Sequence, residues 1–242
     1  MTRQLRAAAA ASAVLAWAAA QSWAQAPAPQ PWDLLQRWAC ADEPLGPAVA
    51  PLPAVATGDL VFLDLDCGGI CEAIAESTQQ QFGVDGPRLS HVGIVETDGA
   101  LAYVWEAWPG RGVQRVPLSL FLARVKTGEG RPGGYYVGRL SPAARASGRQ
   151  ALARVQALSG TPYDDRFAWD GPGTYCAKLI SAGFAAAGDF RPQPMFYGRA
   201  DSRARAFWTA YFSARGLPVP DGQPGVSPLG IYLEGRAEIF LP

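Results

Sequence analysis

The chain contains a single histidine, His91, and four cysteines, of which Cys176 stands far downstream of the other three. Cysteine hydrolases use a thiol as the nucleophile and an imidazole as its base. In this mechanism the thiolate attacks a carbonyl carbon. Any such mechanism in this chain must use His91. A lone histidine is more often a structural residue, so its surroundings have to decide between the two interpretations.

His91 and Glu106 lie in two strand-like runs on either side of Asp98-Gly99, which is a strong hairpin signal. A turn centred on that dipeptide places His91 directly opposite Glu106, with Cβ atoms roughly 5 Å apart. The carboxylate would then orient the imidazole and favour its protonated form. A loop of three or five residues would separate the two side chains onto opposite faces, and an ordinary cross-strand polar pair is the competing interpretation.

Cys176 lies in the first turn of an expected helix if Thr174 is the N-cap. The positive end of the helix would stabilise a thiolate there, and free backbone N–H groups could bind a developing oxyanion. The same helix carries an apolar stripe, on which a cysteine is more often a small core residue. The stripe consists of Cys176, Leu179, Ile180, Gly183, Phe184 and Ala187. The pattern alone leaves both interpretations open.

The other cysteines are Cys40, Cys67 and Cys71. A disulfide among them suits an exported protein. A metal site needs four good ligands, and only Cys40 and His91 could supplement the Cys67–Cys71 pair, so no metal and no cofactor is expected. Cys67 follows a strand and precedes an expected helix, which leaves it as an alternative nucleophile.

Tyr163 follows the turn Gly160-Thr161-Pro162. The functional interpretation brings Tyr163 close to Cys176, where its hydroxyl could hold a substrate carbonyl or the oxyanion. The competing interpretation is a polar loop with one packed tyrosine.

The N-terminus has the features of a signal peptide over residues 1–24: Arg3 and Arg6 precede an apolar run from Ala7 to Ala20, and small residues follow. The run is too short for a membrane span, and cleavage after Ala24 is favoured over cleavage after Ala26. We therefore expect a periplasmic or secreted protein. The 242 residues carry no net charge and no basic excess, so nucleic-acid binding is not expected.

Beyond the signal peptide we expect a Pro/Ala-rich leader over residues 25–55, then a single catalytic domain over residues 56–242 that ends in an irregular tail from Gly216. Expected strands are Gly58–Leu65, Ser90–Glu96, Leu101–Trp108 and Tyr135–Leu140. Expected helices are Ile70–Thr78, Ser141 to Gly160, Thr174 to Gly188, and one around Phe207–Phe212. Strands followed by helices indicate an α+β domain.

Several of these segments together resemble the YiiX/YebB-like hydrolases, a circularly permuted branch of the NlpC superfamily with a papain-like fold. The segments are Gly58-Asp59-Leu60-Val61-Phe62, Asp64 to Cys71, Ser90-His91-Val92-Gly93-Ile94-Val95, Glu106-Ala107, Pro162-Tyr163-Asp164 and Tyr175-Cys176. The resemblance implies an antiparallel sheet or small barrel packed against helices.

The order histidine, acid, cysteine is that of the permuted branch. By position, the resemblance assigns the base to His91, the orienting carboxylate to Glu106, the nucleophile to Cys176 and a further site tyrosine to Tyr163. The family often has an acidic residue two positions after the cysteine. This chain has Lys178 there, which would alter the polarity of the pocket or a salt bridge beside it.

These observations predict an exported cysteine hydrolase that cleaves an amide bond through a thioester acyl-enzyme. A peptide, including a peptidoglycan fragment, is the expected substrate, and a lipid-linked acyl group is the first alternative. The second alternative is a non-catalytic domain that binds the cell envelope. Four aromatic residues near the motifs could line an apolar pocket or belong to the core, which we favour: Trp105, Trp108, Phe167 and Trp169.

Overall fold

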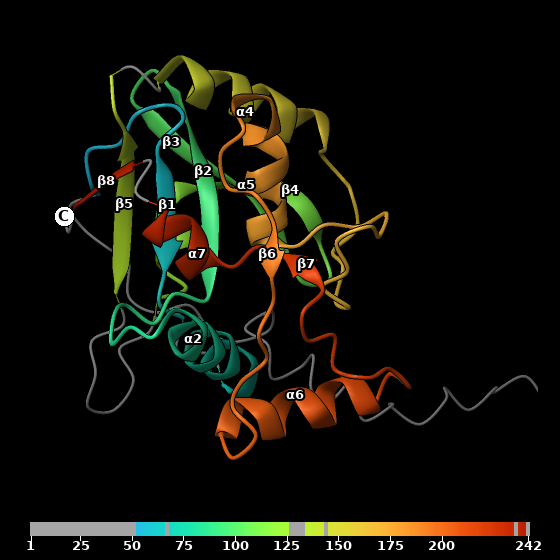
Figure 1. Ribbon diagram of the computed structural model, residues 1–242. Coiled ribbons are helices and arrows are strands. Elements are labelled where there is room, and N and C mark those ends of the chain that lie inside the picture. Colours follow the sequence, from blue (N-terminus) through green and yellow to red (C-terminus); the bar gives the residue numbers. More distant parts are fainter. Residues whose placement is uncertain (1–51, 66–67, 126–133, 143–144, 235–236, 241–242) are drawn as a thin grey trace, which may run out of the picture.

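The computed structural model describes residues 52–65, 68–125, 134–142, 145–234 and 237–240 of the chain (Figure 1). The predicted signal peptide and most of the predicted leader lie outside these residues, as do Cys40 and Cys67. Within them, no helix is both long enough and apolar enough to cross a membrane.

A six-stranded antiparallel sheet forms the centre of the molecule, with the strand order β4-β3-β2-β1-β5-β8. The strands are β1 (Leu60–Leu63), β2 (His91–Asp98), β3 (Leu101–Trp108), β4 (Gly112–Pro117), β5 (Tyr135–Leu140) and β8 (Ala237–Phe240). All four residues of β1 are completely buried, because the strand lies between β2 and β5 and has apolar side chains on both faces. Across the described residues the sheet is open and is not a closed barrel.

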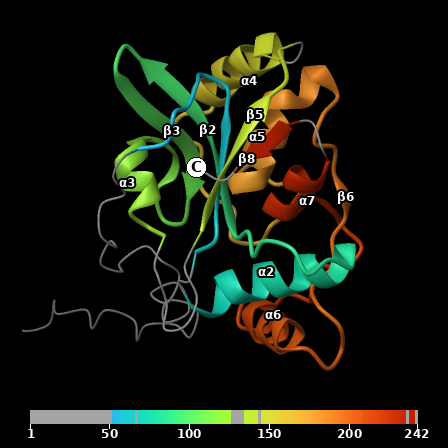
Figure 2. The ribbon, with the colours of Figure 1, turned by 90° about the vertical axis from the view of Figure 1, so that its left-hand side faces the viewer.

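Helices cover both faces and one end of the sheet (Figures 1 and 2). They are α2 (Gly69–Phe82), α3 (Leu118–Leu122), α4 (Arg145–Ala157), α5 (Cys176–Phe184), α6 (Arg203–Ser213) and α7 (Pro228–Leu233). Figure 2 shows α3 on one side of the sheet and α5 and α7 on the other, with α2 across the lower end and α6 beneath it. The mixed antiparallel sheet and helices confirm the predicted α+β class.

The packing of α5 determines where Cys176 lies, because Cys176 is its first residue. Seven of the nine residues of α5 are buried, and they contact β2 in one apolar cluster with α4. Gly183 allows the close approach of α4, since a Cβ there would lie 3.0 Å from Val155 Cγ2 and 3.1 Å from the Ala151 oxygen. The amino end of α5 is thereby held against the end of the sheet where β2 begins.

The predicted strands β1, β2, β3 and β5 are present, and the helix predicted over Ile70–Thr78 is longer, as α2. The prediction of an irregular tail after Gly216 was wrong, because this part contains β7 (Pro224–Gly225), α7 and β8. β7 pairs with β6 (Gln193–Pro194), and β8 pairs with β5. These short elements depend on partners that are distant in the sequence, which periodicity does not reveal.

Candidate active site

His91 is the first residue of β2, and its side chain is almost completely buried. The imidazole ring packs edge-on against Trp108, with 5.1 Å between centroids, and lies tilted against Phe121 of α3, with 5.5 Å between centroids. Two aromatic neighbours leave the ring little freedom to rotate, so its two nitrogens keep fixed directions.

Glu106 accepts a hydrogen bond from His91, with 2.7 Å between Nε2 and Oε2. The predicted contact is present, but the predicted register was wrong. The turn is formed by Gly99 and Ala100, because Asp98 pairs with Leu101. This shift of two positions makes His91 and Glu106 diagonal neighbours on the same face, and a side chain as long as glutamate spans the diagonal.

Two further donors hold the Glu106 carboxylate, which is completely buried. Arg124 donates from Nη1 to Oε2 at 2.5 Å, and Gln114 donates from Nε2 to Oε1 at 2.9 Å. The Arg124 guanidinium also lies over the Trp108 ring, 4.0 Å from its centroid. Glu106 therefore joins a buried network in which a second cation shares its charge.

Cys176 lies beside His91, and the interaction of the two side chains raises the pKa of the imidazole. Nε2 of the imidazole is already bonded to Glu106, so Nδ1 is the nitrogen left for the sulfur. The N-cap of α5 is Tyr175, without a side-chain capping bond, and not Thr174, the residue on which the expected helix start was conditional. Cys176 is thus the first helical residue, and its own N–H has no acceptor within the helix.

The charges of the site oppose the effect of burial. Burial alone would lower the pKa of His91, but the hydrogen bonds to Cys176 and Glu106 raise it from 6.5 to about 9. Burial would raise the pKa of Glu106, but His91 and Arg124 hold it below its ordinary value. At neutral pH the imidazole is therefore protonated and the carboxylate ionised.

Tyr163 lies next to Cys176 because its segment pairs with Thr174, two residues before Cys176. Tyr163 forms an isolated parallel bridge with Thr174, and the N–H of Thr174 donates to the Pro162 oxygen at 3.0 Å. Burial and the neighbouring Cys176 raise the pKa of the Tyr163 phenol well above 10. The hydroxyl therefore keeps its proton at neutral pH and can act as a donor.

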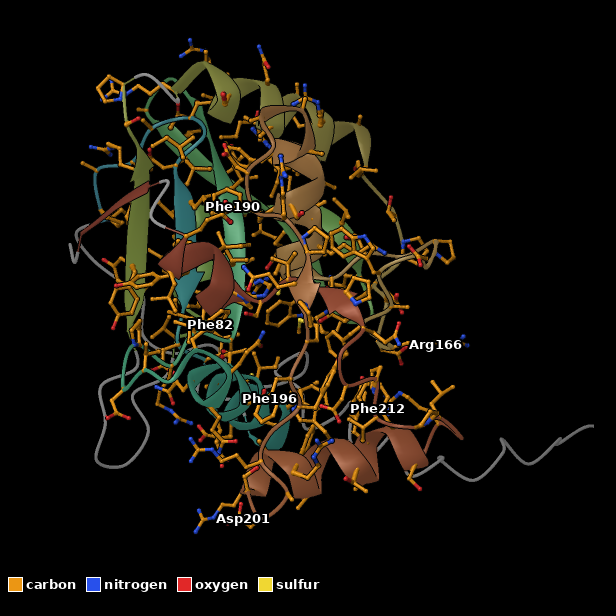
Figure 3. All side chains as sticks on the ribbon, viewed as in Figure 1. Phe82, Arg166, Phe190, Phe196, Asp201 and Phe212 are labelled. Atoms are coloured by element: carbon orange, nitrogen blue, oxygen red, sulfur yellow. The ribbon has the colours of Figure 1, made fainter. Side chains whose placement is uncertain are left out.

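An apolar pocket with a cavity volume of about 40 Å³ lies beside Cys176 and opens to solvent. Its wall includes the amino end of α5, the inner sides of α2 and α6, and the segments around β6 and β7. The main lining residues are Ile74, Tyr163, Phe167, Met195, Phe196, Tyr197, Trp208 and Val226. Figure 3 shows Phe196 above α6 and beside α2. No residue lining this pocket carries a carboxyl, amino, guanidinium or imidazole group.

The four aromatic residues near the motifs differ in their environments. Phe167 lines the pocket, against the prediction that it belongs only to the core. Trp108 packs against His91, and the Trp105 indole donates to Glu96. Trp169 packs half-buried against the main core cluster, as predicted.

Of the three upstream cysteines, only Cys71 lies within the described residues. Cys71 is disulfide-bonded, and its partner lies outside the described residues. Cys176 is a free cysteine. Among the residues that the structure describes, no group of three or more His, Cys, Asp or Glu side chains could hold a metal ion.

Sequence reasoning missed Arg124, Gln114 and the packing role of Trp108. Gln114 faces Glu106 across the β3–β4 pair, so it would have been found if β4 had been predicted. Arg124 follows the five-residue helix α3, and no sequence signal connects it with β3.

One protein family matches the chain over residues 54–210, which is more than half of its length. It is described as permuted papain-like amidase enzyme, YaeF/YiiX, C92 family. Among curated protein sequences none matches. A similar solved structure is the crystal structure of metalloprotein YiiX from Escherichia coli O157:H7, with a TM-score of 0.60 and 22% identity over 76% of this chain and 95% of that chain. The chain therefore belongs to the family of permuted papain-like amidases, YaeF/YiiX, C92, and is a cysteine hydrolase of the amidase or peptidase type.

Proposed function

We propose that Cys176, His91 and Glu106 are the catalytic triad of this hydrolase, and that the enzyme is exported and cleaves an amide bond in a cell-envelope peptide. The succession of neighbouring groups, from the Cys176 sulfur to the imidazole and on to the buried, hydrogen-bonded carboxylate, carries the proposal. It contains each group that nucleophilic acyl transfer needs.

The reaction begins with a thiolate on Cys176 and a proton on His91. The thiolate forms a bond to the carbonyl carbon, and the resulting oxyanion accepts hydrogen bonds from the Cys176 N–H and the Tyr163 hydroxyl. His91 then gives its proton to the leaving amine, the C–N bond breaks, and a thioester remains. Neutral His91 takes a proton from water, whose oxygen attacks the thioester and releases the acid and the thiolate. Glu106 keeps the imidazole oriented throughout.

A thiol-labelling experiment tests the triad. Iodoacetamide should label Cys176 near neutral pH much faster than it labels glutathione, and His91→Ala should slow this labelling at least tenfold. Equal rates in wild type and His91→Ala would support a non-catalytic envelope-binding domain instead. The disulfide-bonded Cys71 does not compete for the reagent.

Export and substrate are further parts of the proposal. The basic and apolar start of the chain supports export, and fractionation of cells that express the full chain should recover a shortened protein outside the cytoplasm. Recovery of the uncut chain in the cytoplasm would contradict export. An exported amidase meets cell-wall peptides, so peptidoglycan fragments are the substrates to assay first.

The pocket favours a second candidate, a lipid-linked acyl group. Its wall is almost wholly apolar, and a peptidoglycan stem carries charged groups that such a wall does not neutralise. Extraction of the cell envelope with organic solvent separates the two candidate substrates. Turnover confined to the lipid extract would replace the peptide proposal. Turnover of the lipid-free envelope material that remains would support the peptide proposal.

A further inference from the structure

Lys178 binds three backbone carbonyl groups at once. It lies on α5, two residues after Cys176, and its Nζ donates to the oxygens of Ala168 and Gly171 at 3.0 Å each and of Gly173 at 2.9 Å. An ammonium has three N–H donors, so all of them are used. An acidic side chain at this position could not make these bonds, because an ionised carboxylate has no N–H or O–H donor.

The bound carbonyls belong to the segment 162–174, which we call the clamped loop. Asp164 also fixes the loop, since Oδ1 accepts from the Arg166 N–H at 3.0 Å and Oδ2 from the Ala168 N–H at 3.2 Å. Gly173 permits the close packing, because a Cβ there would lie 2.9 Å from the Pro162 oxygen. The backbone conformation of the loop is therefore fixed by the Lys178 ammonium and the Asp164 carboxylate.

Phe167 is held at the inner side of the clamped loop in a left-handed conformation, with φ of +54°. The left-handed region is unfavourable for a residue with a large side chain, so the surrounding contacts must hold Phe167 there. Its ring packs against Tyr175 at 5.4 Å and Trp208 at 5.5 Å, and it lines the pocket beside Cys176.

We infer that Lys178 is a positioning residue: by holding the clamped loop it fixes Phe167 as a wall of the pocket, and so selects which acyl groups reach Cys176. The inference rests on Cys176 being the nucleophile, as proposed above. Lys178 acts through the loop and does not itself touch the acyl group. The aromatic wall would favour a flat or bulky apolar substituent next to the reacting carbonyl.

Two alkylating reagents of different size test the inference in the intact protein. The ratio of the Cys176 alkylation rate with N-benzyl iodoacetamide to that with iodoacetamide measures the contribution of the wall. Lys178→Met should lower this ratio about tenfold, which is the selectivity that one well-placed aromatic contact provides. A change in thiolate reactivity alters both rates equally and cancels. Lys178→Arg, which keeps a cation and several donors, should give an intermediate ratio.

Arg154→Met is the matched control, because Arg154 also donates from a cation to a backbone carbonyl of α5, that of Gly183 at 3.0 Å. It should leave the ratio unchanged even if the protein loses stability. An unchanged ratio in Lys178→Met, or an equal fall in Arg154→Met, would overturn the positioning role.

Limited proteolysis gives a measurement that does not depend on the nucleophile. Arg166 is exposed on the clamped loop, and Figure 3 shows its side chain directed away from the body. Trypsin should cut after Arg166 at least several times faster in Lys178→Met than in wild type or Arg154→Met. Unchanged cutting would show that Lys178 does not hold the loop. Iodoacetamide could label Cys176 no faster than glutathione while Lys178→Met still accelerated cleavage after Arg166. That result would contradict the proposed triad and would still support the role of Lys178 in holding the clamped loop.

Discussion

Replacing Glu106 by glutamine keeps the size of the side chain and removes the negative charge that His91 and Arg124 share. The loss should lower the pKa of His91, since burial already works against the protonated ring and only Cys176 would still oppose it. A hydrogen bond to a charged group contributes about 1.5–3 kcal/mol, and about 1.4 kcal/mol corresponds to one pH unit. We therefore expect the pKa to fall from about 9 in wild type by roughly 1–2, to roughly 7–8.

The chain's single histidine makes this measurement direct, because a ¹⁵N-histidine-labelled protein without a histidine tag gives the signals of one imidazole. Titration of the ring nitrogens followed by NMR reports its protonation. Glu96→Gln is the control, since Glu96 also accepts from an arginine and a tryptophan but its side chain is partly exposed to solvent. It should leave the titration near 9. If Glu106→Gln also titrated near 9, the carboxylate would not set the charge of the imidazole and the argument would be wrong.

Three other results are expected. Gly112→Ala should destabilise the fold by at least about 2 kcal/mol more than Gly160→Ala in urea unfolding, because both glycines have positive φ but only at Gly112 would a Cβ collide with the Thr161 carbonyl. Arg124→Met leaves a buried carboxylate with one cation fewer and should cost about 3 kcal/mol, seen as a fall in Tm of about 10 °C. The raised pKa of His91 adds to the free energy of unfolding, fully below pH 6.5 and progressively less as the pH rises through about 9. The total loss is at most about 3 kcal/mol. Urea unfolding measured at a series of pH values should show this decline in wild type and not in His91→Gln.

The strands that carry the site could be predicted from the sequence because their apolar pattern is local. The run Leu60–Leu63 is apolar throughout, and the Asp98-Gly99 signal placed the hairpin within one residue of the turn. The pairing was still wrong by two positions, since the turn is centred one residue later than the dipeptide suggests. An even error keeps both side chains on one face, which is why the His91–Glu106 contact was predicted correctly from an incorrect register.

The end of the chain shows where a local signal was present but not used. The Ser-Pro start that predicted a helix after Ser141 also occurs at Ser227-Pro228. There it begins α7, and the Ser227 hydroxyl accepts from the Gly230 N–H at 3.0 Å. A helix of six residues gains little from its own hydrogen bonds, so only contacts with the rest of the fold make it stable.

The partners of Glu106 and Lys178 could not have been predicted, because they depend on loop closure and not on spacing. Arg124 reaches Glu106 only once α3 has turned back against the sheet. Lys178 was recognised as a departure from the related hydrolases, but its three acceptors are backbone oxygens, which every residue has. The sequence identified the residue types of the site, whereas the charges that tune them come from tertiary contacts.

The two halves of the site come from different layers of the fold, and apolar packing sets the distance between them. His91 belongs to the sheet and Cys176 to the helix, and no direct chain connection fixes one against the other. Ile94 of β2 and Leu179 of α5 are both completely buried in the cluster that joins these layers. A cavity at either position would allow α5 to shift relative to β2, and a shift of a few tenths of an ångström is enough to weaken a hydrogen bond. The proposed site therefore depends on core residues outside the triad. The permuted order of the chain is tolerated because this packing, and not a direct chain connection, brings the thiol to the imidazole.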